Sequence, residues 1–171
     1  MDKKFLLELD SFLRKASNNS YAGGANPVSS QGFKEFEFKE GPWLYKDRYS
    51  GFFQSWGQET IWFNGQPVWI QVYGGGMEPG FHDKEFASKT FGFLKQALSQ
   101  KNKSSGPKSS LLSPDHIVFQ PRGPKSLNSS PWSYSCSLSG DLSKFQGHEK
   151  ILFKKKLVFT HDFLGGLVIS K

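Results

Sequence analysis

Apolar residues recur along this chain with two different periods. In residues 2–17, and again at about 83–100, they repeat at the spacing of one helical face, which predicts two amphipathic helices. Asp83 and Glu85 lie near the start of the second segment, where acidic side chains suit the positive end of the helix dipole. The apolar residues that share a face are Phe5, Leu9, Phe12, Leu13 and Ala16 in the first segment and Phe86, Phe93, Leu94 and Ala97 in the second.

Outside these two segments the apolar period shortens to two, which is typical of β-strands. Turn residues separate the alternating segments, and Asn64-Gly65 is the strongest hairpin signal because Asn-Gly favours the type I′ turn. We interpret the glycines at 74–76 as a turn that ends a strand. Strands are expected near residues 33–39, 42–49, 53–63 and 66–73 after the first helix, and near 116–120, 131–139, 144–153 and 157–163 after the second.

The two halves of the chain also resemble each other in sequence. The segment that begins at Pro42 returns from Pro131 if one residue of slippage is allowed. The shared positions are mainly aromatic residues, glycines and one acid. Pro42, Trp43, Tyr45, Gly51, Gly57, Glu59, Ile61, Phe63, Val68 and Gly75 match Pro131, Trp132, Tyr134, Gly140, Gly147, Glu149, Ile151, Phe153, Val158 and Gly165.

We therefore expect an α+β fold in a single domain built of two internal repeats, at about 1–82 and 83–171. Each repeat would contribute one helix and four strands, and the two tandem halves would be related by pseudo-two-fold symmetry. The helices would pack on a curved antiparallel sheet. In element order this plan resembles the cystatin-like fold, an analogy that carries no function with it.

Composition narrows the functional classes. The 171 residues suffice for one domain with a real core, and the aromatic content of 16% means that rings supply much of the buried area. Cys136 is the only cysteine, and no His or Cys spacing typical of a metal site occurs, so neither a metal nor a cofactor is expected. No apolar stretch reaches the roughly 18 residues of a membrane span, and acids interrupt the apolar N-terminal run. We expect a cytoplasmic protein without membrane contact.

The net charge of +7 is concentrated in the second half of the chain. Residues 1–82 carry 8 Lys and Arg against 9 Asp and Glu, and residues 83–171 carry 14 against 6, so the halves hold −1 and +8. Clustered lysines bind phosphate backbones, which makes this half a candidate site for nucleic acid or an acidic protein. The alternative is a solvated charge patch in which residues 154–156 form a hairpin turn. The lysines concerned are Lys150, Lys154, Lys155 and Lys156.

An acid occupies the same strand position in both repeats. Alternation places Glu59 on one strand face with Ile61 and Phe63, and Glu149 repeats this arrangement. An acid between large apolar residues loses part of its hydration, so each is a candidate acid or base, or an acceptor for a bound ligand. The alternative is a carboxylate that hydrogen-bonds a neighbouring turn.

The next strand of each repeat has an aromatic face with one polar residue in it. Trp69, Gln71 and Tyr73 share a face, and Phe159, His161 and Phe163 match them in the second copy. If the copies form one sheet, these faces could meet as an aromatic cleft, which is typical of small-molecule sites. The alternative is that the helices pack on these faces and fill them.

Several blocks of the chain together resemble an uncharacterised bacterial family, domain of unknown function 5680. They include FLRKASNNSYAGG, YKDRYSGFFQSWGQETIWFNGQPVWIQVYGG, FQPRGPKS, SGDLSKFQGHEKI and the terminal FLGGLV, and they span nearly the full length. The resemblance implies no known activity. Members that stand behind a helix-turn-helix regulator domain imply a sensing or effector-binding role. The resemblance also implies that Arg122, in the FQPRGP block, anchors an anion or caps a loop. The family often has a Tyr and a His where Phe163 and Leu164 stand here.

The leading hypothesis is a non-enzymatic small-molecule-binding or sensor module with one asymmetric site. One alternative is an interaction protein that binds nucleic acid or another anionic partner through the basic half. The other is an enzyme that uses Glu59 or Glu149 as acid or base, although no catalytic signature motif is present. The residues expected at the ligand site are Trp43, Glu59, Trp69, Tyr73, Arg122, Trp132, Glu149 and His161.

Overall fold

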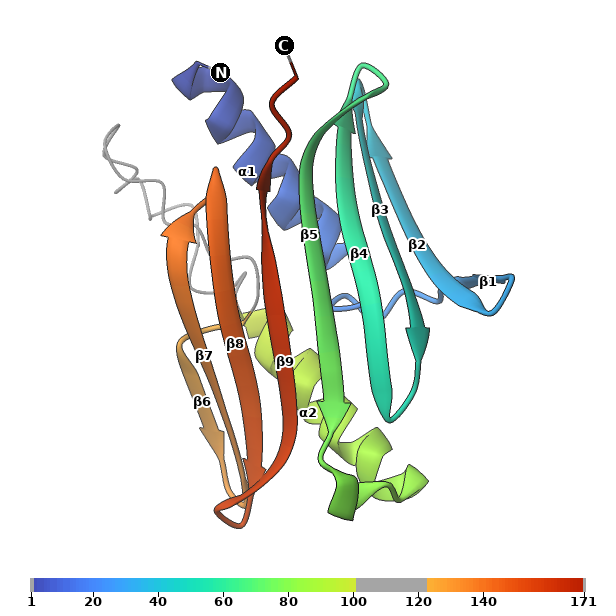
Figure 1. Cartoon of the computed structure of the whole chain (residues 1–171), viewed down its shortest axis with the longest axis vertical. Helices are drawn as coiled ribbons and strands as arrows, with labels where there is room; N and C mark the ends of the chain where they lie inside the picture. The colour runs from blue at the N-terminus through green and yellow to red at the C-terminus, as the bar shows by residue number, and fades with distance from the viewer. Residues whose placement is uncertain (1, 101–122, 171) are drawn as a thin grey trace.

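A computed structural model describes residues 2–100 and 123–170 as an α+β fold, with one large antiparallel sheet and two helices (Figure 1). The helices are α1 (Lys3–Asn18) and α2 (Lys84–Gln100), and a short 3₁₀ helix (Pro79–Phe81) precedes α2. The strands are β1 (Val28–Ser30), β2 (Phe33–Glu40), β3 (Trp43–Gly51), β4 (Gln54–Phe63), β5 (Gln66–Met77), β6 (Ser126–Ser129), β7 (Trp132–Asp141), β8 (Lys144–Phe153) and β9 (Lys156–Leu167).

Both predicted helices are confirmed to within one residue, and side-chain caps explain where they begin. The Asp2 carboxylate accepts a hydrogen bond from the Phe5 backbone N–H at 2.8 Å, and Asp83 does the same for Phe86 at 2.8 Å. Such caps satisfy backbone donors that have no partner inside the helix. Asp83 therefore caps α2 through a direct hydrogen bond, in addition to its favourable position at the positive end of the helix dipole.

The nine strands form one sheet in the order β1-β2-β3-β4-β5-β9-β8-β7-β6. β5 and β9, the last strands of the two predicted groups of four, pair with each other at the centre of the sheet. Tyr73 of β5 lies opposite Phe163 of β9. On either side of this pair, Trp69 lies opposite Leu167 and Met77 lies opposite Phe159. The sheet therefore joins the N-terminal and C-terminal parts of the chain through a continuous ladder of backbone hydrogen bonds.

The strands differ from the prediction in four places. β1 is a three-residue strand that the alternation pattern missed. β6 begins at Ser126 and is short and polar, so it has no period-two signal either, and the strand predicted at 116–120 lies outside the described residues. β5 and β9 run four residues further than expected, to Met77 and Leu167. The predicted turn at glycines 74–76 is wrong, because these glycines continue β5 beside β9.

Glycine is required in this stretch because the two central strands approach closely. Gly75 lies opposite His161 with a φ of 133°, and a Cβ placed on it would be 2.3 Å from the Thr160 carbonyl oxygen. Only a residue without a side chain fits such a backbone contact. The glycines that looked like a turn signal thus allow the central strands to pair.

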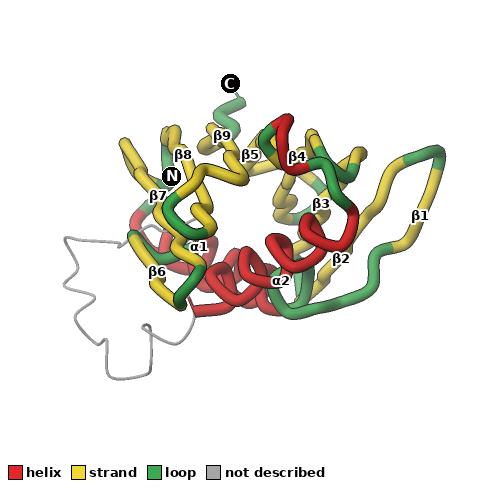
Figure 2. The backbone as a smooth tube through the Cα atoms, turned by 90° about the horizontal axis from the view of Figure 1, so that it is seen from below, coloured by secondary structure: helices red, strands yellow, loops and turns green. Residues whose placement is uncertain are grey.

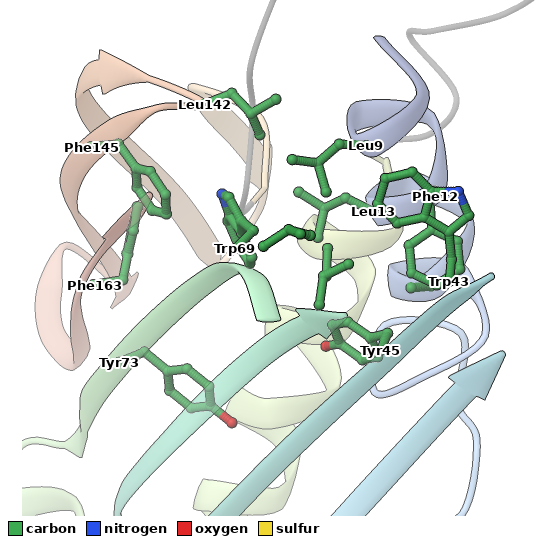
Figure 3. Packing of buried hydrophobic residues seen from close by; sticks show 13 residues of the cluster. Leu9, Phe12, Leu13, Trp43, Tyr45, Trp69, Tyr73, Leu142, Phe145 and Phe163 are labelled. Atoms are coloured by element: carbon green, nitrogen blue, oxygen red, sulfur yellow. The ribbon is translucent and has the colours of Figure 1, made fainter. Parts of the chain in front are cut away.

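Both helices lie on the same, concave face of the curved sheet (Figure 2). Beneath α1, a first core joins Leu9, Phe12 and Leu13 to side chains of β3, β5 and β8 (Figure 3). Beneath α2, a second core joins Phe93 and Leu94 to side chains of β7, β8 and β9. The two cores share strands, since β8 contributes Phe145 to the first core and Ile151 to the second.

Candidate functional site

A cavity of about 460 Å³ lies on the concave side of the sheet. Its volume is in the range of pockets that enclose small-molecule ligands, about 300–1,000 Å³. Aromatic and polar side chains line it from five strands, from α2 and from the segment that follows α1. Among them are Tyr21, Tyr45, Asp47, Tyr49, Ser55, Glu59, Tyr73, Phe91, Lys95, Phe159 and His161.

Two carboxylates lie side by side in this lining. Asp47 of β3 and Glu59 of β4 are direct cross-strand partners, and their exposed fractions are 4% and 7%. Side chains at such positions have Cβ atoms about 4.5–5.5 Å apart. Gln71 of β5 extends the row, and its Nε2 donates a hydrogen bond to Glu59 Oε1 at 3.1 Å. The cavity therefore has a buried acidic floor.

Tyr73 reaches this floor from β5 by crossing β4. Its hydroxyl donates a hydrogen bond of 2.7 Å to Asp47 Oδ1. The ring passes over Gly57, its cross-strand partner, and a Cβ at Gly57 would lie 2.5 Å from the Tyr73 hydroxyl oxygen. The glycine thus provides the space in which the phenol lies.

Tyr45 completes the polar wall on the side of β3. Complete burial raises the pKa of Tyr45 well above its usual value, and the nearby Glu59 and Asp47 carboxylates raise it further. Half-burial also raises the pKa of Tyr49, with a second contribution from Asp47. Both phenols therefore stay protonated at neutral pH and keep their hydrogen-bond donors.

A second buried acid lies behind the cavity and contacts it through a histidine. Glu149 is fully buried, and it accepts a 2.7 Å hydrogen bond from the Tyr134 hydroxyl. Its other oxygen lies 3.3 Å from His161 Nδ1. The opposite ring nitrogen, Nε2, lies 3.5 Å from Ser55 Oγ, and both His161 and Ser55 line the cavity.

The acids that precede or follow the histidines in the sequence are not the acids that His148 and His161 contact. His161 contacts Glu149 on the adjacent strand, whereas His148 Nδ1 lies 2.8 Å from Asp162 Oδ1 in an exposed pair. Strand alternation explains this result, because consecutive residues point to opposite faces of the sheet, whereas cross-strand partners point to the same face.

One inward position of β4 that lines the cavity carries a small side chain, Ser55. Ser55 lies opposite Gly75 in the sheet, and next along that row is His161. In the other half, Phe145 lies opposite Gly165 in the same manner. Phe145 is buried and stacks on Trp69, with ring centroids 5.6 Å apart. At its own position Phe145 thus fills the space that corresponds to the open space beside Ser55.

The three tryptophans predicted for the ligand site pack in or against the two cores and do not line the cavity. Trp43 packs against Phe5 and Phe12 of α1. Trp132 stacks on Phe86 and Phe93 of α2, and Trp69 is fully buried. Of the remaining predicted residues, Glu59, Tyr73 and His161 line the cavity, Glu149 lies behind it, and Arg122 lies outside the described residues.

Asp47, Tyr45 and Ser55 belong to the site but were not singled out from the sequence. Tyr45 was visible as a match to Tyr134, but only as part of the repeat. Asp47 lies two residues further along the same strand face, so alternation would have placed it inward. Its polar side chain between Tyr45 and Tyr49 was the available signal.

The basic residues of the second half lie at one end of the β8–β9 hairpin. Lys154 and Lys155 form its turn with φ values of 48° and 66°, and Lys156 begins β9. All three are exposed, as is Lys150 on β8. Lys154 Nζ lies 5.5 Å from the centre of the Phe153 ring.

No group of three or more His, Cys, Asp or Glu side chains in residues 2–100 and 123–170 is placed to hold a metal ion. Neither helix in this part of the chain has the length and apolarity that a membrane span requires.

The comparisons with known proteins give one match. Residues 47–168 match the model of a family described as Domain of unknown function (DUF5680). No curated protein and no solved structure matches the chain.

Proposed function

The chain belongs to the DUF5680 family, and we propose that it binds a small molecule in the cavity on the concave side of the sheet, as a non-enzymatic ligand-binding or sensor module. One observation carries the proposal: Asp47 and Glu59, both buried, line the same cavity. Burying a carboxylate costs free energy, and pairing two of them costs more. Such an arrangement is more typical of a binding site than of a core that only packs.

Residues from both parts of the chain would contact the ligand. Tyr73 and Glu59 come from β5 and β4, and His161 comes from β9. The Tyr73 and His161 rings are neighbours, with centroids 5.7 Å apart. A ligand between them would therefore contact both sides of the central strand pair.

We further propose that the chain is one domain of two repeats, about 1–82 and 83–171, related by a pseudo-two-fold axis near Tyr73 and Phe163. The evenly spaced pairs on either side of that residue pair support this interpretation. The cystatin-like comparison remains an analogy in element order. Divergence between the repeats, with Ser55 on one side and Phe145 on the other, accounts for a single cavity.

A thermal-shift screen against metabolites tests the ligand-binding proposal, because a compound that binds only the folded state raises the melting temperature. Ser55→Phe should fill the cavity as Phe145 fills its counterpart, so it should abolish the shift. Ser126→Phe is the matched control, since Ser126 is exposed on the edge strand β6. Failure of every compound to shift the wild type, or a shift that persists in Ser55→Phe, would refute the proposal.

Exposure of the hairpin lysines favours a second candidate function, binding of nucleic acid or an acidic protein in the cytoplasm. A contact of this kind weakens steeply as salt rises, because the partner's counterions are released on binding. Reversal of Lys154, Lys155 and Lys156 to Glu should remove retardation of DNA or RNA at low salt. Equal retardation by wild type and the reversed variant would exclude this surface.

For the enzymatic alternative, the structure leaves Glu59 as the better candidate of the two acids. Glu59 lines the cavity, whereas Glu149 is fully buried and bonded to Tyr134 and His161, so Glu59 is the acid that a substrate could reach. Turnover in a hydrolase screen that Glu59→Gln abolishes, with the fold intact, would favour this alternative over simple binding.

A further inference from the structure

We infer that Ser55 is a nucleophile that takes an acyl group from an ester bound in the cavity, with His161 as its general base and Glu149 as the residue that positions His161. A serine, a histidine and a buried acid in successive contact are the parts from which proteins build an activated serine. The inference goes beyond the proposed function by adding a covalent step, and it rests on that function because the ester must enter the same cavity.

The three side chains belong to one row that runs across four strands of the sheet. Ser55 of β4 lies opposite Gly75 of β5, which lies opposite His161 of β9. His161 in turn lies opposite Glu149 of β8. Cross-strand partners point to the same face of a sheet, and Ser55 and His161 both line the cavity on its concave side.

Ser55 and His161 meet because the strand between them carries no side chain in this row. Neighbouring strands lie about 4.7–4.9 Å apart, and β4 and β9 are separated by the whole of β5. His161 Nε2 nevertheless lies 3.5 Å from Ser55 Oγ. A Cβ placed on Gly75 would lie 3.1 Å from His161 Cδ2, so a side chain there would crowd the imidazole. The glycine thus provides the space through which the imidazole reaches the serine.

Glu149 fixes the imidazole from the other side. Its Oε1 lies 3.3 Å from His161 Nδ1, and its Oε2 accepts the 2.7 Å hydrogen bond from the Tyr134 hydroxyl. An ionised carboxylate only accepts hydrogen bonds, so Nδ1 carries the hydrogen in this contact and Nε2 turns its lone pair toward Ser55. That tautomer is the one that a general base requires. Contacts between a nucleophile and its base are often long before a substrate binds and shorten once it is in place.

A second row across the same four strands has the same plan with unreactive side chains. Phe145 of β8 lies opposite Gly165 of β9, which lies opposite Gln71 of β5. Gln71 lies opposite Glu59 of β4, and its amide donates to that acid at 3.1 Å. The second row shows that a phenyl ring and an amide suit this plan. Packing therefore does not account for the hydroxyl and the imidazole in the row of Ser55.

The proposed step transfers an acyl group from one oxygen to another. As Ser55 Oγ attacks the carbonyl carbon of the ester, the hydroxyl proton passes to His161 Nε2. The bond from that carbon to the oxygen of the alcohol part then breaks, and His161 gives the proton to the departing oxygen. The products are a free alcohol and an acyl group held on Ser55 by an ester bond, with no change of oxidation state.

The rings beside the imidazole indicate the class of ester. The centroid of the His161 ring lies 4.7 Å from that of Phe159 and 5.7 Å from that of Tyr73. Phe91 of α2 lines the same cavity. Aromatic lining of this kind favours an apolar or aromatic group next to the reacting carbonyl. We therefore expect esters with a ring-sized apolar part to react best.

Two reagents that modify activated serines test the inference. p-Nitrophenyl acetate releases coloured p-nitrophenolate when its acetyl group is transferred, and phenylmethanesulfonyl fluoride sulfonylates such serines. Each reagent should modify the wild type at least about 100-fold faster than Ser55→Ala, and peptide mass spectrometry should locate the added group on Ser55. Modification of lysines, the N-terminus or Cys136 alone, at equal rates in the wild type and Ser55→Ala, would overturn the inference.

His161→Gln tests the general base. This variant should fold, because it gives the row the amide that Gln71 supplies in the second row. It should slow the modification of Ser55 about 100-fold or more, since an amide cannot take up the serine proton. His148→Gln is the matched control, because His148 also contacts an acid, Asp162, but in an exposed pair that does not line the cavity. A wild-type rate in His161→Gln would overturn the inference.

Glu149→Gln tests the positioning role. The variant keeps an oxygen that can accept the bond from Tyr134, so it should fold. It should lower the maximal rate of sulfonylation at least about 10-fold and leave the half-saturating concentration of phenylmethanesulfonyl fluoride unchanged. A loss of structure would change both quantities. An unchanged maximal rate would refute the positioning role of Glu149.

The inference and the proposed function fail in different ways. If a compound of the metabolite screen raises the melting temperature and neither reagent modifies Ser55, the cavity is a ligand site and the inference of a nucleophile is wrong. Release of p-nitrophenolate once per chain would show that Ser55 captures its ligand covalently. Repeated release that is lost in Ser55→Ala would support the nucleophile, and it would overturn the non-enzymatic part of the proposed function.

Discussion

The Tyr73 hydroxyl lies 2.7 Å from Asp47 Oδ1, although the two residues belong to strands that are not neighbours in the sheet. The strand between them contributes Gly57 at the crossing point, which leaves room for the phenol ring. A hydrogen bond across an intervening strand makes the acidic floor depend on three adjacent strands at once. Positions that look unrelated along the chain therefore act together in the site.

Gly57→Ala should destabilise the protein. The added Cβ would lie 2.5 Å from the Tyr73 ring and hydroxyl, so the ring must move and its bond to Asp47 must lengthen. Overpacking of this kind costs about 1–3 kcal/mol. Urea denaturation of the two proteins measures the difference in the free energy of unfolding.

Gly92→Ala is the matched control for that experiment. Gly92 lies within α2, and a Cβ there would contact nothing within 4 Å. Because alanine favours a helix over glycine by about 1 kcal/mol, this variant should be as stable as the wild type or more stable. Equal destabilisation by the two variants would contradict the packing of Tyr73 over Gly57.

Tyr134 and Glu149 should be energetically coupled. Their 2.7 Å hydrogen bond is buried, and truncating either partner leaves a buried polar group unsatisfied. A double-mutant cycle with Tyr134→Phe and Glu149→Ala should give a coupling energy of at least about 1 kcal/mol. The exposed pair Glu85–Lys89, with an Nζ–Oε1 distance of 2.8 Å, serves as the reference and should give less than about 0.5 kcal/mol. Coupling no larger than this reference would contradict the buried contact.

The stability of the protein should fall at alkaline pH through Tyr45. Burial and two neighbouring acids raise its pKa in the folded state, whereas the unfolded chain has the ordinary value of about 10. Its contribution to stability is complete below that value. As the pH rises above it, the unfolded state alone loses the proton, and unfolding becomes easier by up to about 1.4 kcal/mol per pH unit.

Denaturation of the wild type and Tyr45→Phe between pH 7 and 11 measures this effect. The difference between the two proteins should be constant up to about pH 9 and should then change in favour of the variant. Tyr49→Phe should show a smaller change, because that ring is only half-buried. Parallel pH profiles for the wild type and Tyr45→Phe would show that Tyr45 ionises as freely in the folded protein as in the unfolded chain.

The fold was largely predictable where alternation is strong. β3, β4, β7 and β8 each begin and end within about two residues of the prediction, because apolar and polar positions alternate regularly along them. β6 was not predictable in this manner, since its sequence is polar and its pairing with β7 comes from tertiary structure. The extension of β5 through its glycines depends on how closely β9 approaches, which no local pattern records.

The site was predictable only in part, for a related reason. Trp43, Trp69 and Glu59 all lie on the inward face of the sheet. Alternation grouped Trp69 with Gln71 and Tyr73, and Glu59 with Ile61 and Phe63, but it does not say what covers each face. α1 covers the two tryptophans, while the region around Glu59 stays open. Asp47 was not predicted, because the residue that pairs with Glu149 as Asp47 pairs with Glu59 is Cys136, so no matching acid marks the position.

The asymmetry itself predicts that Phe145→Ala and Ser55→Phe have unequal effects on stability. Phe145 is 3% exposed and stacks on Trp69, so its truncation should cost about 3–5 kcal/mol through a new cavity in the first core. Ser55→Phe adds a ring where about 460 Å³ is already empty, so it should cost less than about 1 kcal/mol, well below the cost of overpacking a filled site. Urea denaturation of both variants checks the comparison. If Ser55→Phe were as costly as Phe145→Ala, the space beside Ser55 would not be large enough for an aromatic ring, and therefore not for a ring-sized ligand.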